Sequence, residues 1–276
     1  MRGRRVSVHF LSMKRCLFLV SLLALLSLLT GCYTVPETGR KSLMLVPLGQ
    51  EAHLGESSFA DIKAQRKVSS DPFMTATVTR VGTRIAHVVG DALPNAKWEF
   101  VLFDDDSPNA FALPGGKVGV HTGLFRIAHT DDELAIVMGH EIAHVIARHG
   151  SERMSQGLLV AAGGVALDVA LKDKESSERQ AWLAAYGLAG TGLVILPYSR
   201  LNENEADEIG LRYAARAGYD PRAAIDFWTR MKLESEGKGK PPEWMSTHPS
   251  DDTRIRKLNQ FMPIALEEYE LSKTKQ

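Results

Sequence analysis

Residues 130–150 read TDDELAIVMGHEIAHVIARHG, and this stretch decides how the chain can fold. Thr130 is a residue type that accepts backbone hydrogen bonds at a helix N-terminus, and the three acidic residues after it suit the positive end of the helix dipole. Apolar residues then recur up to Gly150, a residue type that often ends helices. The stretch therefore predicts a helix from about residue 131 to His149.

Within this helix, His140, Glu141 and His144 form the pattern HExxH. Residues four apart lie one helical turn from each other, so both imidazoles point the same way and can bind one metal ion, while Glu141 projects beside the open coordination position. The pattern thus predicts a metal-dependent hydrolytic site. The plainer alternative is that these side chains only form the solvated face of a helix.

A catalytic zinc site needs a third protein ligand and keeps a fourth position for water. In metzincin peptidases a histidine follows the second ligand by six residues, but Gly150 occupies that position, so the metzincin class is excluded. His149 lies five residues after His144, about 140° away around a continuous helix, which favours a surface position or an indirect contact with the site.

A later acidic segment, SRLNENEAD at residues 199–207, offers the third ligand. Glu203 and Asp207 lie one turn apart, so one carboxylate can bind the metal while the other hydrogen-bonds the outer nitrogen of a ligating histidine, which we expect to be His140. Glu205 projects about 160° away from Asp207 and is expected to point away from the metal. The predicted cofactor is one Zn²⁺ per chain, although other divalent ions also bind such ligand sets. The predicted ligands are His140, His144 and Glu203.

Together, the HExxH and SRxxExEAD motifs resemble those of the gluzincin metallopeptidase family that includes HtpX, BepA, LoiP and the CAAX prenyl proteases. The similarity covers nearly the whole chain after residue 32, and the organisation is closest to that of the LoiP-type lipoprotein metalloproteases. It extends to four further segments: Thr38–Arg40, Leu43–Val46, Asn109–Gly116 and Ser246–Pro249 with Arg254.

This resemblance implies that Glu203 is the third zinc ligand and that His248 and Arg254 stabilise the oxyanion of the reaction. His248 has two other interpretations, as a fourth zinc ligand that keeps the enzyme silent or as a turn residue before a proline. The resemblance also implies that an edge strand beside the cleft holds an extended substrate by its main chain. The substrate-binding residues would be Asn109, Ala110 and Phe111.

The first 31 residues are predicted to be a lipoprotein signal peptide. Basic residues precede the apolar stretch Cys16–Leu29, and Leu29–Cys32 resembles a lipobox, so Cys32 is expected to carry the lipid anchor. An uncleaved anchor or an ordinary secretory signal is the alternative. Residues 32–48 are expected to be a lipidated, turn-rich tether without a stable element, and residues 49–270 a single metallopeptidase domain. In lipoproteins of Gram-negative bacteria, a residue other than Asp after the cysteine, here Tyr33, implies sorting to the outer membrane, facing the periplasm.

The expected fold class is α+β and mostly helical, with a zincin-like domain and a small antiparallel sheet beside the HExxH helix. The strands are predicted at residues 98–103 and 117–121. Two stretches rich in alanine and glycine, 157–171 and 182–198, are predicted to be buried core helices, with membrane insertion of the second as the alternative. Further helices are expected at residues 50–67, 71–89, 202–217, 220–233 and 249–260, with a frayed C-terminus.

Charge adds little to the functional assignment. The 276 residues carry 33 basic and 33 acidic side chains, with no basic stripe, so nucleic acid is not an expected partner. The function predicted from the sequence is a zinc-dependent endopeptidase that cuts polypeptides, such as misfolded or outer-membrane proteins of the cell envelope. The alternative is a latched, weakly proteolytic, lipid-anchored assembly factor.

Overall fold

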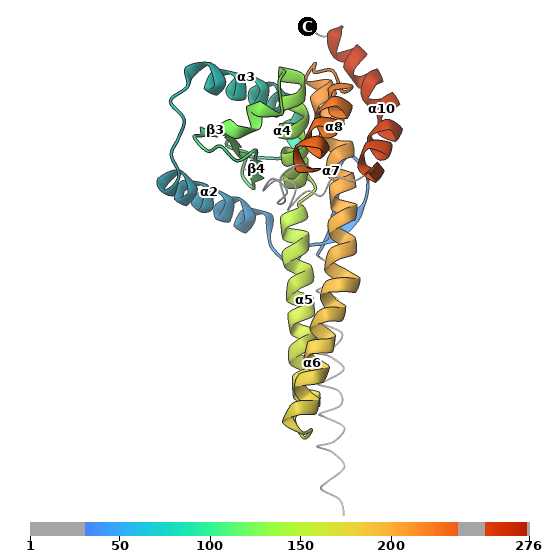
Figure 1. Ribbon diagram of the computed structural model, residues 1–276. Helices are drawn as coiled ribbons and strands as arrows, with labels where there is room; N and C mark the ends of the chain where they lie inside the picture. Colours follow the sequence, from blue (N-terminus) through green and yellow to red (C-terminus); the bar gives the residue numbers. More distant parts are fainter. Residues whose placement is uncertain (1–30, 237–251, 275–276) are drawn as a thin grey trace, which may run out of the picture.

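A computed structural model describes residues 31–236 and 252–274. Figure 1 shows a body of helices around a small sheet, from which a long helical arm projects. The body contains α2 (Leu48–Gln65), α3 (Pro72–Val89), α4 (Asp131–Ile146), α7 (Leu196–Arg216), α8 (Ala223–Glu236) and α10 (Asp252–Lys273). The arm consists of α5 (His149–Ala170) and α6 (Ser176–Gly190), and residues 191–195 form a π-helical turn between α6 and α7. The mostly helical α+β class predicted from the sequence is confirmed.

Helix α4 lies at the centre of the body. Its N-terminus is capped as expected, because the Thr130 hydroxyl accepts a hydrogen bond from the Glu133 backbone N–H at 3.2 Å. Nearly all of its side chains are buried, including His140 and Glu141. Most of the helix surface is therefore covered, and His140 and Glu141 are buried, which rules out the interpretation of the HExxH residues as a solvated face.

The sheet contains three strands in the order β3 (Glu99–Phe103), β5 (Lys117–His121), β4 (Ala110–Leu113). The two predicted strands, β3 and β5, are parallel, so the antiparallel pairing expected for them is wrong. The antiparallel pair of the sheet is β4 with β5. The residue pattern did not predict β4, which returns the chain between the two predicted strands in the segment where the family resemblance implies an edge strand. Because β4 lies at the edge of the sheet, one side of its backbone is free of strand partners within the described sheet.

Residues 32–47, here called the strap, form more structure than the tether predicted from the sequence. Strands β1 (Cys32–Thr34) and β2 (Lys41–Leu43) pair in antiparallel fashion, and the turn between them includes Gly39 with φ 68°. Val35 and Met44 are buried in the body. The expectation of a segment without a stable element is wrong, because its few apolar residues find long-range partners that local periodicity does not reveal.

The predicted continuous helix up to His149 is interrupted. Helix α4 ends at Ile146, Arg148 adopts the left-handed conformation with φ 57°, and α5 begins at His149. Arg148 is held there by hydrogen bonds from its guanidinium to Glu51 at 3.0 Å and to the Val46 carbonyl at 2.8 Å. Gly150 therefore does not end the helix; it lies in the first turn of the next one.

The two stretches rich in alanine and glycine form the arm, not a buried core, so that prediction is wrong. Beyond Ser155, most side chains of α5 and α6 are exposed, as Val165 (66%) and Leu188 (77%) illustrate. The helices cover each other along one face only, because the hairpin extends past the body (Figure 1). Among the described residues, none of the helices combines the length and the apolar character that crossing a bilayer requires.

The C-terminal helix also differs from its prediction. Helix α10 continues to Lys273, through Pro263 and well past residue 260, so the described part of the segment expected to be frayed is largely helical. It packs against α7 and α8, and its buried residues include Leu258 and Ala265. Short 3₁₀ turns at Gly90–Ala92 and Thr122–Arg126 complete the described elements.

Candidate metal centre

Helices α4 and α7 approach each other closely at two glycines. A Cβ atom placed on Gly210 would lie 2.6 Å from the backbone nitrogen of His140, and one placed on Gly139 would lie 2.7 Å from the Gly210 carbonyl oxygen. Real Cβ contacts are almost never that short, so only glycine permits this spacing. The close approach brings the acidic segment of α7 within reach of the HExxH residues.

Three side chains converge at this crossing. The Nε2 atoms of His140 and His144 are 3.1 Å apart, and the Glu203 carboxylate lies 3.4 Å from the first and 3.5 Å from the second. In a tetrahedral zinc site with bonds of about 2.1 Å, ligand atoms are separated by about 3.4 Å. Within the described residues, this trio is the group that meets the geometric requirement for a shared metal ion. The donor set and its spacing therefore fit Zn²⁺.

The outer nitrogen of His140 is bonded to Asp207, as the sequence predicted. His140 Nδ1 lies 2.9 Å from Asp207 Oδ1, and Arg254 in turn contacts Asp207 at 2.7 Å. Burial raises the pKa of Asp207, but the Arg254 charge and the hydrogen bond from His140 outweigh it and hold the pKa below its usual value. Asp207 is therefore an ionised acceptor, which fixes the proton of His140 on Nδ1 and directs Nε2 at the metal position.

The acidic surroundings also favour a proton on His140 when no ion is bound. Burial and the Arg254 charge lower the pKa of His140, but hydrogen bonds to Asp207 and Glu203 outweigh them and raise it to about 9. Because a metal ligand must be a neutral imidazole, a proton and a metal ion compete for this nitrogen.

The outer nitrogen of His144 is bonded to His149, a contact that the sequence left undecided. The two Nδ1 atoms are 2.8 Å apart, and His149 Nε2 lies 2.9 Å from Glu205 Oε2. Burial outweighs the attraction of Glu205 and lowers the pKa of His149, so the ring is neutral. The break at Arg148 brings the His149 side chain into contact with His144. The separation of about 140° expected between these two residues applies only to a continuous helix. Glu205 does point away from the metal, as expected, but towards His149.

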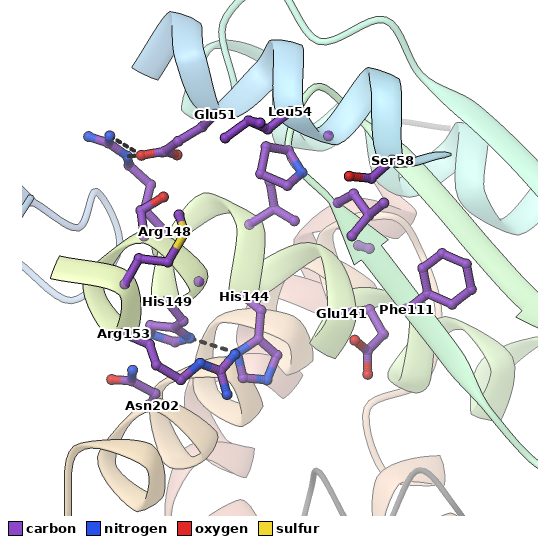
Figure 2. A pocket seen from close by; sticks show the side chains of 18 of the residues that line it. Glu51, Leu54, Ser58, Phe111, Glu141, His144, Arg148, His149, Arg153 and Asn202 are labelled. Carbon is purple, nitrogen blue, oxygen red and sulfur yellow. Dashed lines mark hydrogen bonds and ion pairs between the residues drawn. The ribbon is translucent and has the colours of Figure 1, made fainter. Parts of the chain in front are cut away.

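Glu141 lies at the floor of a cavity of about 590 Å³ beside the metal position. Helices α2, α4, α5 and α7 and strand β4 line this cavity, and Figure 2 shows the Glu141 carboxylate between His144 and Phe111. The predicted substrate-binding residues all belong to its lining: Asn109, Ala110 and Phe111. The arrangement thus places a carboxylate, a metal-binding trio and an edge strand around one space.

The structure places Arg254 beside the metal position, and the oxyanion role that the resemblance implies for it stays a prediction. Its guanidinium is buried against the ring of Trp228, with 3.4 Å from Cζ to the ring centroid, and contacts Asp207 and Glu203. It is not among the residues that line the cavity. Its contacts therefore orient the predicted ligand Glu203 and the Asp207 carboxylate that is bonded to His140.

Two other predicted residues are not part of the described centre. His248 lies outside the described residues, as does the predicted signal segment up to residue 30. Cys32 is an exposed free thiol at the start of the strap.

The sequence did not predict that four polar residues join one another beside the metal position. They are the partly exposed Arg40 and the buried Glu152, His149 and Glu205. The sequence marked Thr38–Arg40 as a family segment and gave His149 two alternatives, but charge in a sequence usually indicates surface. Burial of these residues depends on contacts between segments more than 100 positions apart, such as Arg40 and Glu152.

Comparisons with known proteins agree with this geometry. The sequence model of peptidase family M48 matches residues 72–262. The mitochondrial metalloendopeptidase OMA1 of Schizosaccharomyces pombe is 35% identical over 238 residues, which cover 84% of this chain and 66% of that protein. The beta-barrel assembly-enhancing protease of Escherichia coli K12 is 30% identical over 261 residues, which cover 86% of this chain and 50% of that protein. The chain thus spans about half to two thirds of the length of these relatives, and the resemblance inferred from the motifs is confirmed.

Proposed function

This chain belongs to peptidase family M48, and from that premise we propose that it is a zinc-dependent endopeptidase acting on polypeptides of the cell envelope. The observation that carries the proposal is the convergence of two Nε2 atoms and one carboxylate with mutual distances of 3.1–3.5 Å. Glu141 beside them, in a cavity open to an edge strand, supports hydrolysis over a structural role for the metal. The ligands are His140, His144 and Glu203.

A zinc ion in this position supplies a Lewis acid that lowers the pKa of a water molecule and polarises the scissile carbonyl. The protein residues handle the protons. Glu141 takes a proton from the attacking water and then delivers it to the leaving amine. Asp207 and Arg254 keep the ligand side chains oriented, since both are buried and bonded to them. His248 remains the proposed stabiliser of the oxyanion or, alternatively, a reversible zinc ligand.

The substrate binds as an extended strand along β4. The free edge of β4 offers main-chain donors and acceptors at regular spacing, so a peptide can pair with it whatever its side chains are. Asn109, Ala110 and Phe111 lie where this edge meets the cavity. This mode favours unfolded or stalled chains as substrates, because only they present an extended backbone.

The lipid anchor is proposed at Cys32, with residues 1–31 as the signal peptide and residues 49–270 as the peptidase domain. Support comes from the exposure of Cys32 and from the name of the Escherichia coli relative, which concerns assembly of β-barrels. Anchoring in the outer membrane, with the site in the periplasm, would bring the enzyme to such clients.

The test is Glu141→Gln, which keeps the shape of the side chain but removes its basicity. The variant should bind one zinc per chain and lose nearly all cleavage of unfolded casein, since general base catalysis contributes about 10²–10⁴-fold. Wild-type protein treated with a chelator, then given zinc, is the control and should lose and regain activity. Full activity of Glu141→Gln would refute the mechanism, and wild-type protein that binds no stoichiometric metal would refute the site.

A further inference from the structure

We propose that Arg40 of the strap is a positioning residue for the metal ligand His144, acting through Glu205 and His149. This inference rests on the zinc site proposed above and deepens it. It assigns the strap, which begins at Cys32, a part in the geometry of the metal centre.

A continuous series of contacts connects Arg40 to His144. Arg40 Nε donates to Glu205 Oε2 at 2.7 Å, and the same oxygen lies 2.9 Å from His149 Nε2. His149 Nδ1 lies 2.8 Å from His144 Nδ1. The Thr38 hydroxyl also donates to Glu205, so two strap residues hold this carboxylate.

The direction of these hydrogen bonds is set by chemistry. An ionised carboxylate only accepts, so Glu205 requires a proton on His149 Nε2. A neutral imidazole then has its lone pair on Nδ1, which must accept from His144 Nδ1–H. His144 is thereby left with a lone pair on Nε2, the atom that faces Glu203 at 3.5 Å. The series therefore selects the tautomer of His144 that binds metal.

Arg40 holds the far end of the series in place because it binds two buried carboxylates at once. Its terminal nitrogens donate to Glu152 of α5 at 2.7 and 2.9 Å, while Nε serves Glu205 of α7. Both glutamates are almost fully buried. Removal of the guanidinium would leave two buried carboxylates without the cation that holds them in place. The Glu205 side chain would then move and release His149.

Other contacts of the strap are independent of this series and provide a matched control. Glu37 lies three residues away and accepts two hydrogen bonds from Arg216, at 2.7 and 2.9 Å, and one from Tyr213. None of these contacts reaches the metal ligands. A Glu37→Gln variant therefore weakens strap docking without touching the contacts to His144.

The experiment compares Arg40→Met, Arg40→Lys and Glu37→Gln in the full chain. Zinc affinity is measured by competition with a chromogenic chelator, and ligand geometry by the visible spectrum of the cobalt-substituted protein. Arg40→Met should weaken zinc binding about 10–100-fold, the range found when partners of metal ligands are removed, and change the cobalt spectrum. Arg40→Lys retains the positive charge but not the planar guanidinium that binds both carboxylates. Its zinc affinity should therefore lie between those of Arg40→Met and the wild type. Glu37→Gln should bind zinc and give a cobalt spectrum like the wild type.

Wild-type zinc affinity and an unchanged cobalt spectrum in Arg40→Met would overturn the proposal. An equal loss of affinity in Glu37→Gln would also overturn it, because docking of the strap in general would then be the cause. Should Arg40→Met fail to fold, Glu205→Gln is the second test. The amide of Gln can donate to His149, so it no longer fixes the tautomer of His149 or, through it, that of His144. Weakened zinc binding is again expected, and unchanged binding would refute the inference. Failure of the zinc site itself would differ, since the wild type would then bind no stoichiometric metal.

Discussion

Gly210→Ala should separate the two helices that form the metal centre. The added Cβ would lie 2.6, 2.7 and 2.8 Å from the His140 nitrogen, the Gly139 carbonyl carbon and the His140 Cα. All three are backbone atoms of α4, which cannot turn aside as a side chain does. Relief therefore requires α7 to move by about 0.8 Å to reach ordinary van der Waals contact at 3.4 Å.

Two opposing free energies decide the effect on stability. Alanine gains about 1 kcal/mol over glycine in a helix, whereas overpacking in a core costs about 1–3 kcal/mol. Because three backbone atoms clash, we expect the upper end of the cost and a net destabilisation of about 2 kcal/mol. The metal centre should suffer more, because a shift of 0.8 Å in α7 carries Glu203 beyond the tolerance of about 0.2 Å for ligand distances.

Urea unfolding and zinc titration check this prediction. Gly157→Ala in α5 is the matched control: nothing lies within 4 Å of its added Cβ, so it should stabilise the protein by about 0.5–1 kcal/mol and leave zinc binding unchanged. A Gly210→Ala variant that matches the wild type in both stability and zinc affinity would show that the contact does not control the helix spacing.

Two further predictions concern the strap. Burial raises the pKa of Glu37, but hydrogen bonds from Arg216 and Tyr213 outweigh it and hold the pKa below its usual value. Glu37 therefore stabilises the fold fully above about pH 4.5, and this contribution is lost as the pH falls through the pKa of Glu37 in the folded protein. The difference in unfolding free energy between wild type and Glu37→Gln should therefore shrink on acidification from pH 7 to 3, and a constant difference would contradict the ion pair. Cys32→Ser behind an ordinary secretory signal should release the enzyme from membranes on fractionation, whereas continued retention would indicate that the exposed apolar arm also binds lipid.

Much of the fold was predictable because the signals for a helix lie in the sequence of the helix itself and its immediate neighbours. The cap at Thr130, the proline after Asp71 and the apolar periodicity of α3 and α4 depend on neighbours in the chain, and these helices lie close to their predicted positions. The arm was misjudged because its alanine and glycine content resembles that of a core. Composition indicates which residues can be buried. The residues of α5 and α6 are exposed because the hairpin extends beyond the body, and only the tertiary structure shows this.

The sequence by itself determined the two halves of the candidate centre. The spacing of His140 and His144, and of Glu203 and Asp207, sets which side chains share a helix face, since the helical repeat is a local property. Tertiary structure alone decided how the remaining groups join them. Glu51 and Val46, about 100 positions away, hold Arg148 in a conformation that a continuous helix forbids, and this turns His149 towards His144. Such a break depends on long-range contacts that no local pattern encodes.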